Sequence, residues 1–145
     1  MNAPADSQFA ERIRASFGRQ QAMALIGANL GRVAPGVVEI ALPFRDDLTQ
    51  QKGFVHGGII GMIADSAAGY AAYSLMPADC TLVTAEYKIN LLASATSSLV
   101  ARGEVVKAGR TLTVARAEVY AVDGTHIATM QQTLMMLAGR KDHPE

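Results

Sequence analysis

The most conspicuous residue chemically is Asp65, the only charged side chain between His56 and Asp79. Helical spacing places small residues such as Gly61 and Gly69 beside it. A carboxylate with so little bulk around it has room for a ligand, and it can serve as a general base or as a nucleophile. The alternative is a structural aspartate that is hydrogen-bonded to a neighbouring strand or subunit.

A second group, His56, Gly57 and Gly58, stands where the helix that carries Asp65 should begin. Two glycines there leave backbone N–H groups unshielded at the positive end of the helix dipole. Such groups bind anions or stabilise an oxyanion. The plainer interpretation is an ordinary helix N-cap with His56 packed in front of it.

Gly57 and Asp65 are too far apart in one helix to act on the same carbonyl group. They are eight residues apart, which corresponds to roughly 12 Å along the helix axis. Two antiparallel helices from two subunits would bring Asp65 of one chain to the helix N-terminus of the other. The sequence therefore predicts a homodimer with two equivalent sites.

Other catalytic constellations find no support in the sequence. The three histidines, His56, His126 and His143, are not spaced as a metal-ligand set. No Gly-x-Ser-x-Gly motif indicates a serine nucleophile. We therefore expect no metal site.

Composition is typical of one globular domain. Of 145 residues, 50% are hydrophobic and 18% are charged, and the 13 basic residues balance the 13 acidic ones. Nucleic-acid binding would require an uncompensated basic face, so we expect no nucleic-acid partner. Cys80 is the only cysteine, and no apolar segment follows a basic N-terminus. Both observations favour a cytoplasmic protein.

The first part of the chain predicts a short helix and a pair of strands. Apolar residues four apart predict an amphipathic helix within residues 1–21. Strands are expected at residues 22–33 and 36–43, with a turn between them. The loop that follows, residues 44–55, has a length that often carries function.

A long uncharged helix is expected over residues 59–76, since strong helix formers continue up to Pro77. The stretch is about as long as a membrane span, but it contains Asp65 and is dominated by Gly, Ala and Ser. We interpret it as a buried central helix and expect no membrane partner.

The rest of the chain predicts an antiparallel meander of four strands rich in Val, Thr, Leu and Tyr. They are expected at residues 81–92, 98–107, 110–122 and 126–137. This sheet can bury the uncharged helix only by curving around it, which makes the fold class α+β. Residues 22–138 would form the domain, and residues 139–145 a flexible tail.

Residues 53–58, Gly-Phe-Val-His-Gly-Gly, followed by residues 64–69, Ala-Asp-Ser-Ala-Ala-Gly, resemble the signature of hotdog-fold acyl-CoA thioesterases. The branch typified by the phenylacetate-pathway thioesterase and human acyl-CoA thioesterase-like proteins is the most similar in pattern. Residues 84–92, Gly109-Arg110 and Asp123-Gly124 are also similar. The resemblance, which runs from about residue 22 to 137, implies a long helix wrapped by a curved antiparallel sheet. It also implies a homodimer, often paired further into a homotetramer.

The activity implied by the resemblance is hydrolysis of acyl-CoA to a free acid and CoA, with no cofactor other than the CoA of the substrate. Gly57, after His56 in the motif, would offer its amide to the thioester oxygen, and Asp65 would be general base or nucleophile. An Asn that orients the carbonyl or water usually stands six residues before the histidine, where this chain has Gln50. Thr84 matches a hydroxyl residue that positions water, but it is equally an ordinary β-branched strand residue.

Candidates for the CoA phosphates and the acyl group are less specific. Arg110 and Lys107, at a turn, and Gly58, at the helix N-terminus, are candidate phosphate-binding residues, although most surface charges only solubilise a protein. Met62, Tyr70 and Tyr73 are candidate lining residues of an acyl pocket, or ordinary core.

Two other functions compete with thioester hydrolysis. A hotdog dehydratase or hydratase would act on a 3-hydroxyacyl chain with a different pairing of histidine and acid. The single helix aspartate after His-Gly-Gly favours the thioesterase. A non-catalytic acyl-CoA-binding module would bind acyl-CoA without releasing the thiol.

Overall fold

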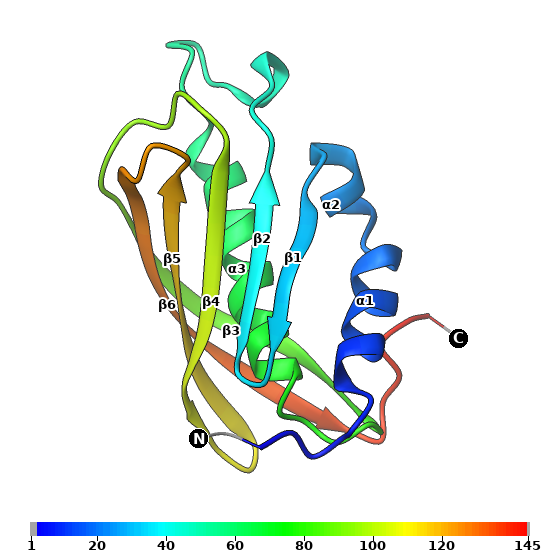
Figure 1. The fold of residues 1–145 in the computed structure, drawn as a ribbon. Coiled ribbons are helices and arrows are strands. Elements are labelled where there is room, and N and C mark those ends of the chain that lie inside the picture. The colour runs from blue at the N-terminus through cyan, green and yellow to red at the C-terminus, as the bar shows by residue number, and fades with distance from the viewer. Residues whose placement is uncertain (1–2, 145) are drawn as a thin grey trace.

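A computed structural model describes residues 3–144, and it has one long helix wrapped by one curved sheet (Figure 1). The central helix is α3, Gly57–Tyr73, and two shorter helices precede the sheet, α1 at Phe9–Arg19 and α2 at Gln21–Ile26. The six strands are β1 Asn29–Ala34, β2 Val37–Leu42, β3 Cys80–Leu91, β4 Leu99–Ala108, β5 Leu112–Ala121 and β6 His126–Ala138, and a 3-10 turn spans Asp46–Leu48. The predicted α+β architecture is confirmed.

The central helix is largely buried because most of its residues are apolar and many of them are small. Ala64, Ala67 and Ala71 are inaccessible to solvent, and β4 approaches so closely that a β-carbon on Gly103 would overlap the backbone of Ala67. Glycine is therefore required at that crossing. Within residues 3–144, no helix combines the length and the apolarity that crossing a membrane requires.

Strand order differs in one respect from the predicted meander. The order across the sheet is β1-β2-β4-β5-β6-β3, and every neighbouring pair is antiparallel. The strand β3 thus pairs with β6 at one edge, and β4 pairs with β2 instead of β3. The connection over residues 92–98 therefore crosses the sheet rather than making a hairpin, and within it Ala95 accepts a hydrogen bond from Val55, in the loop before α3.

The first predicted strand begins later than expected, since residues 22–26 belong to α2. Met23 and Ile26, three residues apart, are both buried, as one face of a helix requires. Gly27 follows with a positive φ of 75° and ends the helix in the left-handed conformation that favours glycine. The strand β1 then starts at Asn29.

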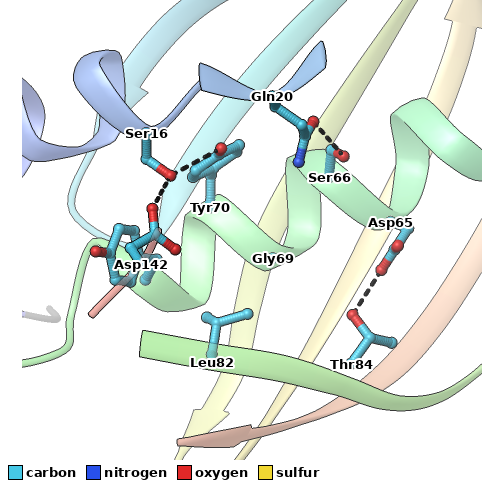
Figure 2. Close-up of a pocket in the computed structure, with 10 residues that line it drawn as sticks. Ser16, Gln20, Asp65, Ser66, Gly69, Tyr70, Leu82, Thr84 and Asp142 are labelled. Atoms are coloured by element: carbon cyan, nitrogen blue, oxygen red, sulfur yellow. Dashed lines mark hydrogen bonds between the residues drawn. The ribbon is translucent and has the colours of Figure 1, made fainter. Parts of the chain in front are cut away.

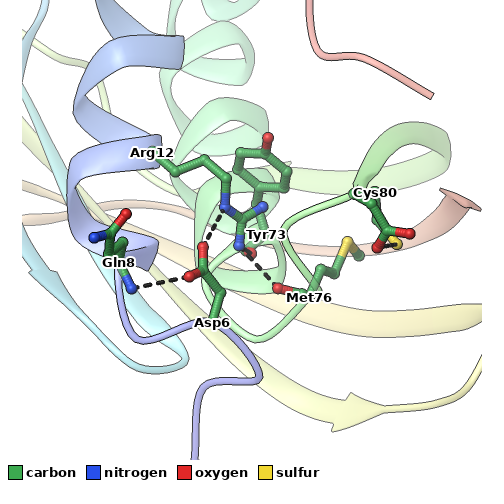
Figure 3. A network of polar contacts seen from close by, with 7 residues as sticks. Asp6, Gln8, Arg12, Tyr73, Met76 and Cys80 are labelled. Atoms are coloured by element: carbon green, nitrogen blue, oxygen red, sulfur yellow. Dashed lines mark hydrogen bonds and ion pairs between the residues drawn. The ribbon is translucent and has the colours of Figure 1, made fainter. Parts of the chain in front are cut away.

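Helix α1 is fastened to the C-terminal end of α3 by Arg12 (Figure 3). Its guanidinium donates to the backbone carbonyls of Met76, at 2.8 Å, and Tyr73, at 3.3 Å. The same group pairs with Asp6 at 3.0 Å and lies 4.2 Å from the centroid of the Tyr73 ring. Arg12 therefore adds a second donor to the Tyr73 carbonyl, which also accepts from the Met76 N–H at 3.1 Å, and it ties α1 to the turn that follows α3.

Candidate active site

Asp65 projects from the middle of α3 towards β3, where Thr84 donates a hydrogen bond to its carboxylate at 2.8 Å (Figure 2). Both side chains are partly exposed and line a cavity of about 150 Å³. On the sheet side, the fully buried Gln132 donates to the backbone carbonyl of Asp65 at 3.3 Å. The structure therefore brings together two of the residues singled out in the sequence, a carboxylate and a hydroxyl, beside an open cavity.

A β-bulge aims Thr84 at the helix. The register between β3 and β6 shifts between Thr84 and Glu86. Before the shift, Leu82 and Thr84 face the cavity under α3. After the shift, Tyr87 faces the helix, and its hydroxyl oxygen lies 3.3 Å from where a β-carbon of Gly61 would be. Because a bulge changes which face alternate residues occupy, both Thr84 and Tyr87 point towards α3. Strand alternation in the sequence did not reveal this bulge.

At the end opposite Asp65, the cavity is bounded by polar side chains from three elements (Figure 2). Ser16 of α1 lies 3.1 Å from the Tyr70 hydroxyl and donates to the Asp142 carboxylate. Burial raises the pKa of Tyr70, which keeps its hydroxyl protonated. Tyr73 lines the cavity too. Sequence reasoning named the two tyrosines but missed Ser16 and Asp142, since nothing local indicates that α1 and the C-terminal segment meet at α3.

Gly57 lies beside a different cavity, of about 320 Å³, which Gln50 also lines. His56 is the N-cap of α3, and its Nδ1 accepts a hydrogen bond from the Gly58 N–H at 2.8 Å. No described residue accepts a hydrogen bond from the Gly57 N–H. The Gln50 Oε1 accepts from the Lys52 N–H, which leaves the Gln50 side-chain N–H groups available as donors. This end of α3 thus offers donors suited to a carbonyl oxygen.

The two cavities have no lining residue in common. Asp65 and Gly57 lie on one intact helix, roughly 12 Å apart along its axis. Within a single chain the carboxylate and the free amide therefore do not face one carbonyl group.

The edge strand β3 carries exposed apolar side chains. Val83 is 48% exposed, Tyr87 45% and Leu91 54%. Leu91 lies next to Gly57, with its Cδ1 2.7 Å from where a glycine β-carbon would be. An unpaired edge with apolar side chains is a surface on which another strand can pair.

The remaining candidates lie away from both cavities. Lys107 and Arg110 are exposed in the β4–β5 hairpin and line neither one. Across residues 3–144, no three His, Cys, Asp or Glu side chains gather as a metal site would require.

Comparison with known proteins identifies the family. The family model described as Thioesterase superfamily matches residues 52–128, which contain Gly57, Asp65 and Thr84. A crystal structure of a thioesterase family protein from Silicibacter pomeroyi is 49% identical, with a TM-score of 0.88, and the match covers 90% of this chain and 99% of that one.

Two further matches are more distant. The Escherichia coli PaaI protein, from the phenylacetic acid degradation operon, has the same fold at 17% identity, with a TM-score of 0.85 over 91% of this chain and 95% of PaaI. A Halobacterium salinarum protein named "Putative esterase" is 28% identical over 102 residues, 67% of this chain and 68% of that protein. The chain has the hotdog fold and belongs to the thioesterase superfamily.

Proposed function

We propose that this protein hydrolyses acyl-CoA thioesters to a free acid and CoA. The observation that carries the proposal is the Asp65 carboxylate, held by Thr84 at 2.8 Å beside a cavity, within a chain of the thioesterase superfamily. The carboxylate either activates a water molecule or attacks the thioester carbonyl itself. Thr84 orients the carboxylate, and in the first case also the water.

The carbonyl oxygen gains negative charge in the transition state and needs donors directed at it. The Gly57 N–H, at the positive end of α3, supplies one, and the side-chain amide of Gln50 a second. His56 contributes by capping the helix, which leaves the Gly57 N–H as the free donor. Water adds to the carbonyl carbon, the carbon–sulfur bond breaks, and the CoA thiolate leaves.

A complete site requires a homodimer in this proposal. The separation of Gly57 from Asp65 along α3 excludes a site built by one helix. Pairing of two β3 edges, antiparallel about a two-fold axis, would cover Tyr87 and Leu91 and place the two α3 helices side by side. Asp65 of one chain would then face Gly57 of its partner, and two such dimers would form a tetramer.

The remaining parts of the proposal concern the CoA end and the location. Arg110, Lys107 and the helix start at Gly58 are the candidates for the CoA phosphates. The chemistry uses no cofactor and no metal. A cytoplasmic location agrees with the single, buried cysteine, Cys80.

The hydratase alternative places different demands on the site. It requires an imidazole that exchanges protons with the substrate. The Nδ1 of His56 already accepts the Gly58 N–H, so only the Nε2 of this ring is left for proton exchange. The match to the thioesterase superfamily favours hydrolysis.

The test is the isosteric change Asp65→Asn, with Asp79→Asn as a control at an exposed aspartate. We expect kcat for acyl-CoA hydrolysis to fall about 10²–10⁴-fold, as the loss of a general base does. Asparagine can still accept the Thr84 hydrogen bond, so the fold should persist. Release of CoA thiol is measured with a panel of acyl-CoA substrates. Undiminished turnover by the Asp65 variant would contradict the proposal.

A further inference from the structure

The cavity beside Asp65 has two chemically different ends (Figure 2). One holds the Asp65–Thr84 pair, and the other is bounded by Ser16, Tyr70 and Asp142. Tyr70 follows Asp65 by five residues on α3, so the two ends are about 7.5 Å apart along the helix axis. A cavity of about 150 Å³ holds a molecule the size of benzene. A substrate whose thioester lies at Asp65 would direct its acyl group towards the second end.

Asp142 closes that second end and is held there by three donors. Ser16 donates to its Oδ2, Thr81 to its Oδ1 at 3.0 Å, and Arg19 to its Oδ2 at 3.3 Å. Of these, Ser16 lines the cavity, whereas Arg19 and Thr81 do not. The C-terminal segment is thereby fixed to α1 and to β3.

The direction of these hydrogen bonds follows from the donor inventory. A carboxylate only accepts, so the single hydroxyl hydrogen of Ser16 goes to Asp142. Tyr70 must then donate to the Ser16 oxygen, 3.1 Å away. The end of the cavity therefore offers lone pairs on Tyr70 and Asp142 but no hydroxyl hydrogen.

Along the side wall, Ser66 donates to the Gln20 Oε1 at 3.3 Å, which leaves the neutral N–H groups of Gln20. The cation that pairs with Asp142, Arg19 at 3.3 Å, lies outside the cavity lining, and both side chains are partly exposed, so the pair is weakened by solvent. Inside the cavity, the neutral Gln20 does not compensate a second carboxylate placed against Asp142.

We propose that Asp142 is a specificity-determining residue. It limits the acyl group to the length of this cavity, and it determines which terminal groups of the acyl chain are accepted. An acyl group that ends in a hydroxyl can donate to the free lone pairs. An acyl group that ends in a carboxylate faces the negative charge of Asp142 and finds no hydroxyl donor there. Its binding is therefore disfavoured. This inference rests on the proposed function, because the cavity receives an acyl group only if the thioester reacts at Asp65.

The test compares three acyl groups with six carbons each, as hexanoyl-CoA, ω-hydroxyhexanoyl-CoA and adipoyl-CoA. These substrates end in a methyl, a hydroxyl and a carboxylate. For the wild-type protein we expect kcat/KM to be highest for the hydroxyl and at least tenfold lower for adipoyl-CoA than for hexanoyl-CoA. Equal hydrolysis of adipoyl-CoA and hexanoyl-CoA by the wild-type protein would overturn the inference without any variant.

The variant Asp142→Asn removes the charge and keeps the shape. We expect the adipoyl-to-hexanoyl ratio of kcat/KM to rise at least tenfold, mainly through a lower KM for adipoyl-CoA, and the hydroxyl preference to shrink. Asp142→Glu keeps the charge and should retain the wild-type discrimination against the carboxylate. An Asp142→Asn protein with the wild-type ratio refutes the role of Asp142.

Thr81→Val is the matched control. It removes a hydrogen bond to the same carboxylate without altering the wall of the cavity, so the ratio should not change. An equal shift in Thr81→Val would mean that anchoring of the C-terminal segment, and not the charge, sets the preference, which overturns the inference. If the wild-type protein releases the thiol from no acyl-CoA, the proposed function itself is wrong. If it hydrolyses acyl-CoA but Asp142→Asn leaves the adipoyl-to-hexanoyl ratio of kcat/KM unchanged, only the inference about Asp142 is wrong.

Discussion

The two halves of α3 differ in how much of their surroundings the chain itself provides. Around Asp65, the chain supplies the hydrogen-bonding partner Thr84, a cavity, and a far wall made by Ser16 and Asp142. Around Gly57, it leaves an amide without a described acceptor, next to the exposed side chain of Leu91. In the proposed mechanism, the acid–base half would therefore be complete in one chain. The proposed carbonyl-binding half would be open on the side that a second copy occupies.

Apart from Asp65→Asn, the largest effect is expected from Gly57→Pro, which removes the free N–H. Proline is well tolerated at the first position of a helix, so the cap should survive. We expect kcat to fall about 10²–10³-fold, the usual cost of losing one oxyanion donor. Gly57→Ala is the control, since its β-carbon meets Leu91 in the same way but the N–H remains. Equal turnover by the two variants would show that the amide takes no part.

Thr84→Val tests the Asp65 half with a smaller effect. Valine has nearly the shape of threonine but cannot donate to the carboxylate. A hydrogen bond to a charged group contributes about 1.5–3 kcal/mol, so we expect kcat to fall roughly tenfold to a hundredfold. Thr84→Ser should restore most of the rate, because it keeps the hydroxyl. Steady-state kinetics measures kcat for both variants. A Thr84→Val protein with the wild-type kcat would show that Thr84 is a structural strand residue with no part in catalysis.

The smallest effect in energy, about 1 kcal/mol per side chain, is expected at the proposed interface from Leu91→Lys, which charges the exposed β3 edge. Burying half of a leucine gains about 1 kcal/mol, and a two-fold interface contains the residue twice. We expect the dimer dissociation constant to rise at least tenfold and the specific activity to fall on dilution. Val122→Lys, at a turn where valine is 70% exposed, is the control. Sedimentation equilibrium measures both proteins; a Leu91 variant as tightly dimeric as the control would place the interface elsewhere.

Much of the site was predictable because its residues belong to local patterns. The isolated Asp65 in a helix of small residues and the His-Gly-Gly start of α3 both follow from helical periodicity and capping. Thr84 was identified only by resemblance, and its contact with Asp65 depends on the bulge in β3. A bulge leaves no mark in strand alternation when both faces carry mixed residues.

The parts that sequence reasoning missed depend on contacts between distant segments. Ser16 and Asp142 are separated by 126 positions, and neither lies in a motif. The placement of β3 beside β6 also required knowledge of how the loop at Ala95 packs against Val55. Adjacency in the chain favoured a β3–β4 hairpin, and tertiary packing decided otherwise.

Mixing of subunits tests directly whether Asp65 of one chain acts with Gly57 of the other. Asp65→Asn and Gly57→Pro proteins, each inactive alone, are mixed in equal amounts, dissociated and reassembled. A heterodimer then has one site with both residues intact, so about one quarter of the wild-type activity should return for random pairing. If mixed dimers form and no activity returns, the two residues act within one chain and the account is contradicted.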